Sequence, residues 1–118
     1  MIFLQTKKRT VIAAAAIAAA VMAFVAACII AASAAYFGVK SDDITGSRRS
    51  KQIVSARQMA IYLIYDILGL PLAEIGTYIG GRDHTTIGYA RDKIDKMRRD
   101  DPIVERQIQD IRAKLGKA

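Results

Sequence analysis

The most chemically dense part of the sequence is the run Gly80-Gly81-Arg82-Asp83-His84-Thr85-Thr86, which joins a guanidinium, a carboxylate, an imidazole and two hydroxyls. Asp83 beside His84 suggests a general acid–base pair. However, no nucleophile, metal-ligand cluster or second carboxylate accompanies them at a recognisable spacing. We therefore expect no catalytic site, no metal and no other cofactor. In the structural alternatives, Asp83 caps a helix, His84 is an ordinary surface or packed histidine, and the threonines satisfy their own turn.

The segments around this run predict the helices that must position it. Residues 53–68 are too densely apolar for one helix face, so this helix should be the buried centre of the fold. Pro71 starts a short helix through Ile79, and Gly80-Gly81 then breaks the chain tightly. The next helix begins at once, with Asp83 well placed to cap it.

Apolar residues at steps of three and four predict the core faces of the last two helices. They are Ile87, Ala90, Ile94 and Met97 in one, and Val104, Ile108, Ile111 and Leu115 in the other, which Asp101 and Pro102 begin. A first helix should end at Gly38, with residues 41–44 forming a short turn or helical segment. A short helix, a glycine turn and a second helix on a buried helix predict an all-α domain with a helix-turn-helix, whose second helix enters the major groove of DNA. Many all-helical proteins share this pattern by chance, so spacing alone leaves DNA binding and other functions equally open.

Charge divides the chain into two parts. Lys and Arg number 18 against 11 Asp and Glu, for a net charge of +7, and Lys7, Lys8 and Arg9 are the only charged residues before Lys40. A basic surplus on a small chain suits a phosphate backbone or an anionic membrane surface, and charge does not choose between them. The 118 residues allow one compact domain and an appendage, which we place at residues 29–118 and 1–28.

The N-terminal part is apolar without interruption from Val11 to Ala32 and rich in alanine, which predicts a helix. Residues 11–32 pass the length test for a membrane anchor, although the domain's use of residues 29–39 leaves only about seventeen for a span. A second interpretation is a soluble helix with a core-facing stripe made by Ile12, Ile17, Val21, Phe24, Val25, Cys28 and Ile29. A third is that the stretch is not natural sequence. The lone Cys28 is interpreted as a small buried hydrophobe rather than a reactive thiol.

The run from Gly80 to Ile87 is nearly identical to the signature of the C-terminal DNA-binding domain of bacterial DnaA-type replication initiators. The resemblance covers most of residues 29–118. Residues 47–50 and 56–60 resemble the family's basic loop and the helix that follows it, and Leu72 with residues 74–76 matches the first helix of its helix-turn-helix. The eight residues of this run have an unusual composition, and the segments before it match the family at the expected spacing. Such a combination is far more specific than a lone glycine motif.

This resemblance implies a six-helix, Trp-repressor-like domain, here preceded by an alanine-rich apolar helix. It further implies cytoplasmic binding of short, asymmetric AT-rich boxes in double-stranded DNA at a replication origin. The base-contacting residues would be Asp83, His84, Thr85 and Thr86 in the major groove and Arg49 in the minor groove. The DNA backbone contacts would come from Arg48, Lys51, Arg57, Leu72, Ala73 and Arg82. The chemistry agrees, because a carboxylate accepts from cytosine, an imidazole donates to a purine, threonine contacts thymine, and arginine is drawn to a narrow minor groove.

The sequence departs from the family at two positions that matter for DNA. Pro71-Leu72-Ala73 stands where Ser-Leu-Pro is usual, which removes a hydroxyl cap but restores the N–H of Ala73, so phosphate binding there should survive. Tyr65 occupies a position where the family often has a basic residue that contacts the DNA backbone. Its absence should lower the slope of log K for DNA binding against log salt concentration by about one. The charges between Arg91 and Asp100 alternate in sign and are interpreted as a solvated face.

No run resembles the GxxxxGK[ST] phosphate loop of the ATPase module to which the family couples this domain. The chain is therefore either an excised domain or a free-standing relative. In the first case its partner is the ATPase module of the full-length initiator, and residues 11–27 correspond to the helix that joins the two. The rival hypothesis is a membrane-tethered basic helical protein, anchored through residues 11–32, that binds DNA or lipid only nonspecifically.

Overall fold

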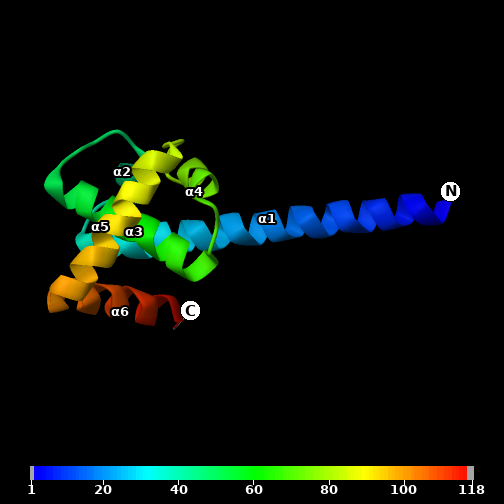
Figure 1. The fold of residues 1–118 in the computed structure, drawn as a ribbon. Coiled ribbons are helices and arrows are strands. Elements are labelled where there is room, and N and C mark those ends of the chain that lie inside the picture. The colour runs from blue at the N-terminus through cyan, green and yellow to red at the C-terminus, as the bar shows by residue number, and fades with distance from the viewer. Residues whose placement is uncertain (1, 117–118) are drawn as a thin grey trace.

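The computed structural model describes residues 2–116, with side chains from Arg9 onward, so the side chains of Lys7 and Lys8 lie outside it. In this range the chain is all-helical, as the sequence predicts. The helices are α1 (Ile2–Phe37), α2 (Ser41–Thr45), α3 (Lys51–Leu68), α4 (Leu72–Tyr78), α5 (His84–Asp100) and α6 (Pro102–Gly116). Helices α2 to α6 gather around the C-terminal end of α1, and the rest of α1 projects from them as a rod (Figure 1).

Glycine, proline and a serine cap set the helix boundaries. Gly69 ends α3 with a φ of 62°, in the left-handed region that favours glycine, and its N–H donates to the Tyr65 carbonyl. The Ser50 hydroxyl accepts a hydrogen bond from the Ile53 N–H at 3.3 Å and so caps α3 at its start. This helix therefore begins at Lys51, slightly earlier than its apolar pattern indicates.

Helix α3 forms the centre of the core, as its apolar density predicts. It packs against α1, α2, α4 and α5, and it buries Met59, Ile61, Leu63 and Ile64 almost completely. The predicted apolar faces of the last two helices are confirmed by the buried residues Ile87, Ala90, Ile94, Val104, Ile108 and Ile111. The faces end sooner than predicted, because Met97 is 37% exposed and Leu115 is only partly buried.

The prediction of a core-facing stripe along α1 is wrong for most of its length. Ile12, Ile17, Val21 and Phe24 are 51–70% exposed, and from Arg9 onward the first fully buried side chain of α1 is Ala26. The reason is geometric: the projecting part of α1 extends beyond the other helices, so no element of the described chain covers it (Figure 1). Cys28 lies where α1 enters the domain and is half-buried rather than buried.

Candidate nucleic-acid interface

The turn between α4 and α5 is tight because glycines allow the backbone to close on itself. The Gly76 carbonyl accepts hydrogen bonds from the N–H groups of Gly81 and Arg82 at 2.9 and 3.1 Å. A Cβ on Gly76 would lie 1.9 Å from the Arg82 carbonyl oxygen. Gly80 has a φ of 70°, and a Cβ there would lie 2.0 Å from the Thr45 carbonyl oxygen. The turn is therefore packed against the residues that lead into the basic loop, which we define as residues 46–50.

The first turn of α5 presents the polar residues that the sequence singled out. His84, Thr85 and Thr86 are all exposed. The Asp83 carboxylate accepts a hydrogen bond from the Thr86 N–H at 2.8 Å, which confirms its predicted role as a cap. This backbone hydrogen bond is the main cause that lowers the pKa of Asp83 from its ordinary value. An ionised carboxylate has about four acceptor positions, so capping does not exclude a further donor from a base.

The basic loop carries exposed cations beside the start of α3. Arg48, Arg49 and Lys51 are exposed, and Nη1 of Arg48 lies 4.0 Å from Oδ1 of Asp43. At this separation and exposure the ion pair holds Arg48 only weakly. All three cationic side chains are thus accessible to an anionic partner.

Arg57, in contrast, is 7% exposed and directed into the protein. Its Nε donates to the Ile44 carbonyl at 2.7 Å. Its Nη2 lies within hydrogen-bond distance of three more carbonyl oxygens, those of Asp43, Gly46 and Arg48, at 2.9, 3.2 and 2.9 Å. Burial lowers the pKa of Arg57, and the nearby charges of Arg82 and Arg49 lower it further. Sequence reasoning assigned Arg57 a DNA backbone contact and missed this role in holding the loop.

Arg82 holds the same segment from the other side. Its Nη2 donates to the Gly46 carbonyl at 2.6 Å, and its Nη1 donates to the Ile79 carbonyl at 2.8 Å. Burial is the main cause that lowers the Arg82 pKa, and the Arg49 charge adds to it. Arg57 and Arg82, hereafter the arginine brace, thus meet at the Gly46 carbonyl and connect the basic loop to the turn between α4 and α5.

A depression of about 240 Å³ lies between α3 and α5, with Arg49 of the basic loop at its edge. Arg49, Arg57, Arg82 and Thr86 line it, together with Gln58 and Tyr89. The structure therefore brings the predicted minor-groove residue Arg49 and the predicted major-groove residue Thr86 to one concave surface. Tyr89 is 66% exposed and was not among the predicted site residues. Its position three residues after Thr86, outside the apolar stripe of α5, is the sequence signal that could have identified it.

The start of α4 offers backbone rather than side-chain chemistry. Pro71 occupies the N-cap position and makes no side-chain cap hydrogen bond. Leu72 is partly buried and Ala73 is exposed in the first turn, where the N–H groups of a helix lack partners within the helix. The N–H of Ala73 therefore lies where the sequence predicts a phosphate contact.

Two charged groups of α5 have contacts that the sequence did not reveal. The Arg91 guanidinium lies over the Tyr65 ring at 4.7 Å from its centroid, so a cation stands beside the position where the family often has a basic residue. Arg98 pairs with Glu105 of α6 at 2.8 Å and also donates to the Tyr62 hydroxyl. The solvated face predicted between Arg91 and Asp100 therefore includes a link between α5 and α6.

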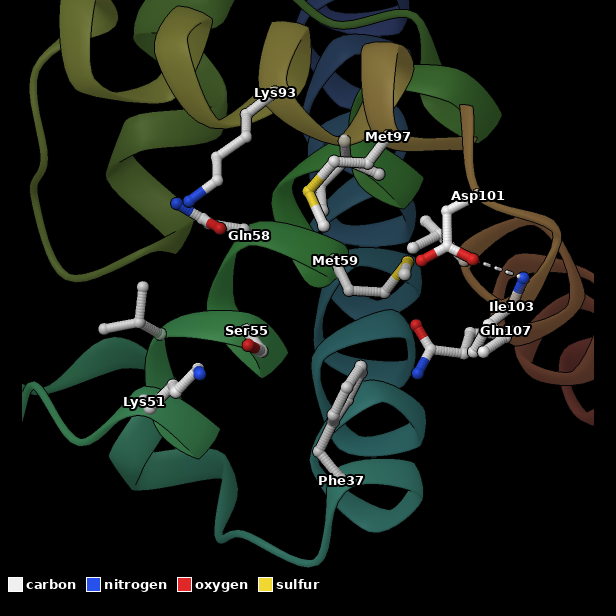
Figure 2. A pocket seen from close by; sticks show the side chains of 13 residues that line it. Phe37, Lys51, Ser55, Gln58, Met59, Lys93, Met97, Asp101, Ile103 and Gln107 are labelled. Atoms are coloured by element: carbon white, nitrogen blue, oxygen red, sulfur yellow. Dashed lines mark hydrogen bonds between the residues drawn. The ribbon is translucent and has the colours of Figure 1, made fainter. Parts of the chain in front are cut away.

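A second and larger hollow, of about 450 Å³, lies among α1, α3, α5 and α6. Figure 2 shows Met59, Met97 and Phe37 around it, with Lys51 and Lys93 on one side and Asp101 on the other. The Asp101 carboxylate accepts from the Ile103 N–H at 2.9 Å, at the start of α6. Of the predicted DNA contacts only Lys51 lines this hollow, so the candidate interface is the depression beside α5.

A short helix, a turn closed on Gly76 and a second helix with an exposed polar first turn, all supported by the buried α3, define a helix-turn-helix domain. Comparison with known proteins identifies its family. The chain matches the family described as bacterial dnaA protein helix-turn-helix over residues 26–94. The chain therefore belongs to this DnaA family, whose matching module is non-catalytic.

Curated relatives show how much of a longer protein this module represents. The chromosomal replication initiator protein DnaA of Pelobacter propionicus is 44% identical over 84 residues, which are 71% of this chain and 19% of that protein. DnaA of Thermus thermophilus is 40% identical over 79 residues, 67% of this chain and 18% of the relative. DnaA of Lactococcus lactis subsp. cremoris is 41% identical over 82 residues, which are 70% of this chain and 18% of that protein. The chain thus spans about a fifth of the length of these relatives. The domain boundary between residues 28 and 29 stays a prediction.

Proposed function

We propose that the chain binds double-stranded DNA sequence-specifically at short, asymmetric AT-rich boxes of the DnaA type. The first turn of α5 enters the major groove and the basic loop enters the adjacent minor groove. The observation that carries this proposal is that Arg49 and Thr86, from separate elements of the family's motif, line one concave surface. In this arrangement Asp83, His84, Thr85 and Thr86 contact base edges from α5, and Arg49 contacts them from the loop.

The backbone contacts divide into exposed and internal groups. Arg48 and Lys51 are exposed, and we assign them to phosphates on either side of the loop. The N–H groups of Leu72 and Ala73 at the start of α4 provide uncharged phosphate contacts. Arg57 and Arg82 donate to loop carbonyls. We therefore propose that these two act mainly by fixing the loop and only secondarily by touching phosphate.

The proposed protein partner depends on whether the domain is part of a longer initiator, as in the relatives, or occurs as a separate copy. In an initiator of that length the domain would deliver an ATPase module to the box, while a separate copy would occupy boxes without opening the duplex. In both cases the proposed place of action is the nucleoid in the cytoplasm. The rival function, nonspecific binding of DNA or lipid by a tethered basic protein, predicts no preference between DNA sequences.

Titration of a labelled duplex that carries a DnaA-type box, beside a scrambled duplex of the same composition, tests the proposal at two salt concentrations. We expect His84→Ala and Thr86→Ala to lose about 1–3 kcal/mol on the box and little on the scrambled duplex. Thr86→Ala keeps the N–H that Asp83 caps, so its effect reports the lost side chain. Equal affinity of the unchanged protein for both duplexes refutes the proposal and supports the nonspecific rival.

Arg48→Ala tests the assignment to the phosphate backbone. It should weaken binding to both duplexes alike, because a phosphate contact carries no sequence information. Arg106→Ala, which removes an exposed cation from α6, is the matched control and should have a smaller effect on both. A loss for Arg48→Ala confined to the box would contradict its assignment.

A further inference from the structure

The projecting part of α1 exposes large apolar side chains that no other described element covers. Among the described residues, α1 contains a segment, Arg9–Phe37, long and apolar enough to cross a membrane, and 11% of its most apolar stretch is buried. Val11 and Ile12 are each 67% exposed, Ile17 is 65% exposed and Phe24 is 70% exposed. Exposing such a surface to water is energetically unfavourable.

The apolar side chains face in all directions around this helix, which decides what can cover them. Successive residues turn by about 100°, so Val11, Ile12 and Phe24 lie roughly 100–140° apart around the axis. A second copy of the chain, or a groove on another protein, would cover one side and leave the others in water. A helix that links two domains through solvent needs polar faces, and no polar residue interrupts Val11–Ala32. Hydrocarbon covers every side at once.

The flanking charges fit a bilayer, and the length fits a locally thinned one. The fifteen residues from Val11 to Val25, which precede the buried Ala26, rise about 22 Å, short of the roughly 30 Å of a typical hydrocarbon core. Lys7, Lys8 and Arg9 follow directly on the N-terminal side, and long cationic side chains reach headgroups from a short span. On the other side the nearest cations are Lys40, Arg48 and Arg49. Of these only Lys40 lies within about twenty residues of the segment, so the positive-inside rule by itself favours the orientation with the N-terminus in the cytoplasm.

We infer that α1 inserts residues 11–25 into a lipid bilayer and holds the helix-turn-helix domain at the membrane surface. Insertion depends on the hydrocarbon core and not on anionic headgroups, because the inserted residues are uncharged. The orientation that places the domain in the cytoplasm rests on the proposed DNA binding, whereas insertion itself does not. The domain core begins at Ala26, so it would lie directly against the headgroups.

Flotation with pure phosphatidylcholine vesicles tests the inference. The full chain, purified in mild detergent and reconstituted by dialysis, should float with the vesicles and remain bound after 1 M NaCl (about 3 Å Debye length) and alkaline carbonate washes. Ile17→Cys in a Cys28→Ala background should react with a water-soluble maleimide in detergent-free, vesicle-free buffer at least about tenfold faster than in vesicles. Release by salt or carbonate, unchanged labelling of the cysteine, or recovery as a soluble dimer would each overturn insertion.

A charge placed in the segment provides the matched comparison. Ile17→Glu with Val21→Glu should abolish flotation, because carboxylates within hydrocarbon are strongly disfavoured. Ile103→Glu replaces a similarly exposed residue of α6, 69% exposed, and should float like the unchanged protein. Box binding by the double variant, measured in detergent, should stay within about twofold, so a failure of insertion is distinguishable from a failure of DNA binding. Continued flotation of the double variant would refute the assignment of residues 11–25.

Discussion

Replacing Arg57 by lysine separates a role inside the protein from a direct contact with DNA. The substitution keeps the positive charge but removes the planar guanidinium, which reaches four carbonyl oxygens of the segment from Asp43 to Arg48. A lysine ammonium has three donors at a single point and cannot reach carbonyls spread over this segment. The loop should therefore lose its fixed shape although the net charge of +7 is unchanged.

The structure sets the size of the effect. A hydrogen bond to a charged group contributes roughly 1.5–3 kcal/mol net, and these bonds share one guanidinium, so their contributions are not additive. Allowing for one retained bond and for carbonyls that turn toward water, we expect Arg57→Lys to lower the free energy of unfolding by about 2–4 kcal/mol. This is a large fraction of the 5–15 kcal/mol typical of a domain. Urea unfolding followed by far-ultraviolet circular dichroism measures it, with Arg106→Lys as the exposed control.

The DNA-binding result decides between the two roles. With the folded fraction of the variant held above nine-tenths by temperature, Arg57→Lys should weaken box binding by roughly fivefold or more, about 1 kcal/mol. Scrambled DNA should be affected less, because a disordered loop no longer places Arg49 in the minor groove. If Arg57 acts only as a phosphate contact, the charge-conserving variant keeps its stability and loses affinity equally on both duplexes. That result would refute the brace.

Three further predictions concern the turn, the cap and the departure at Tyr65. Gly80→Ala should lower the free energy of unfolding by at least about 2 kcal/mol, because a left-handed alanine costs roughly 1–2 kcal/mol and its Cβ meets the Thr45 carbonyl; Gly81→Ala, whose Cβ meets nothing within 4 Å, is the control and should cost less. Because the pKa of Asp83 is lower in the folded protein, ionised Asp83 stabilises the fold. This contribution is complete above the ordinary pKa of about 3.9 and is lost as the pH falls through the lower folded pKa. Asp83→Asn should therefore flatten the acid limb of a stability–pH curve, and an unchanged limb would exclude the cap as its cause. Tyr65→Lys should steepen the salt dependence of binding by about one on both duplexes, and no change there would show that DNA does not reach this part of α3.

The fold follows from local signals that act within a few residues. Gly69, Pro71 and the Asp83 cap set helix ends through backbone conformations that do not depend on the rest of the molecule. The density of apolar residues in α3 also identifies the centre of the core. The position of α1 is different, since its apolar pattern suits a protein core and a hydrocarbon phase equally. Only the arrangement of the other helices shows that the residues before Ala26 extend beyond them.

The candidate site was predictable at its surface and not in its interior. The exposed first turn of α5 and the exposed Arg49 are where the motif places them. The brace escaped prediction because the partners of Arg57 and Arg82 are main-chain carbonyls, which every residue possesses and which no sequence pattern marks. From the sequence, a basic residue near a DNA-binding motif is therefore predicted to contact phosphate even where it supports the loop. Tyr89 was missed although it lies three residues after Thr86 on α5, because an exposed aromatic residue does not by itself indicate a DNA contact.

The brace leads to a value for the salt dependence of box binding. Arg48, Arg49 and Lys51 are the exposed cations of the predicted set, while Arg57 and Arg82 donate to the protein's own carbonyls. Each neutralised phosphate contributes about −0.9 to the slope of log K against log salt on B-form DNA. Arg48 and Lys51 at phosphates, together with Arg49 in the minor groove, where its charge also displaces counterions, give a slope of about −3, whereas five cations would give about −4.5. Titrations between about 50 and 200 mM salt resolve this difference, and a slope near −4.5 that falls by about one in both Arg57→Ala and Arg82→Ala would show that these guanidiniums leave the loop for phosphate when DNA binds.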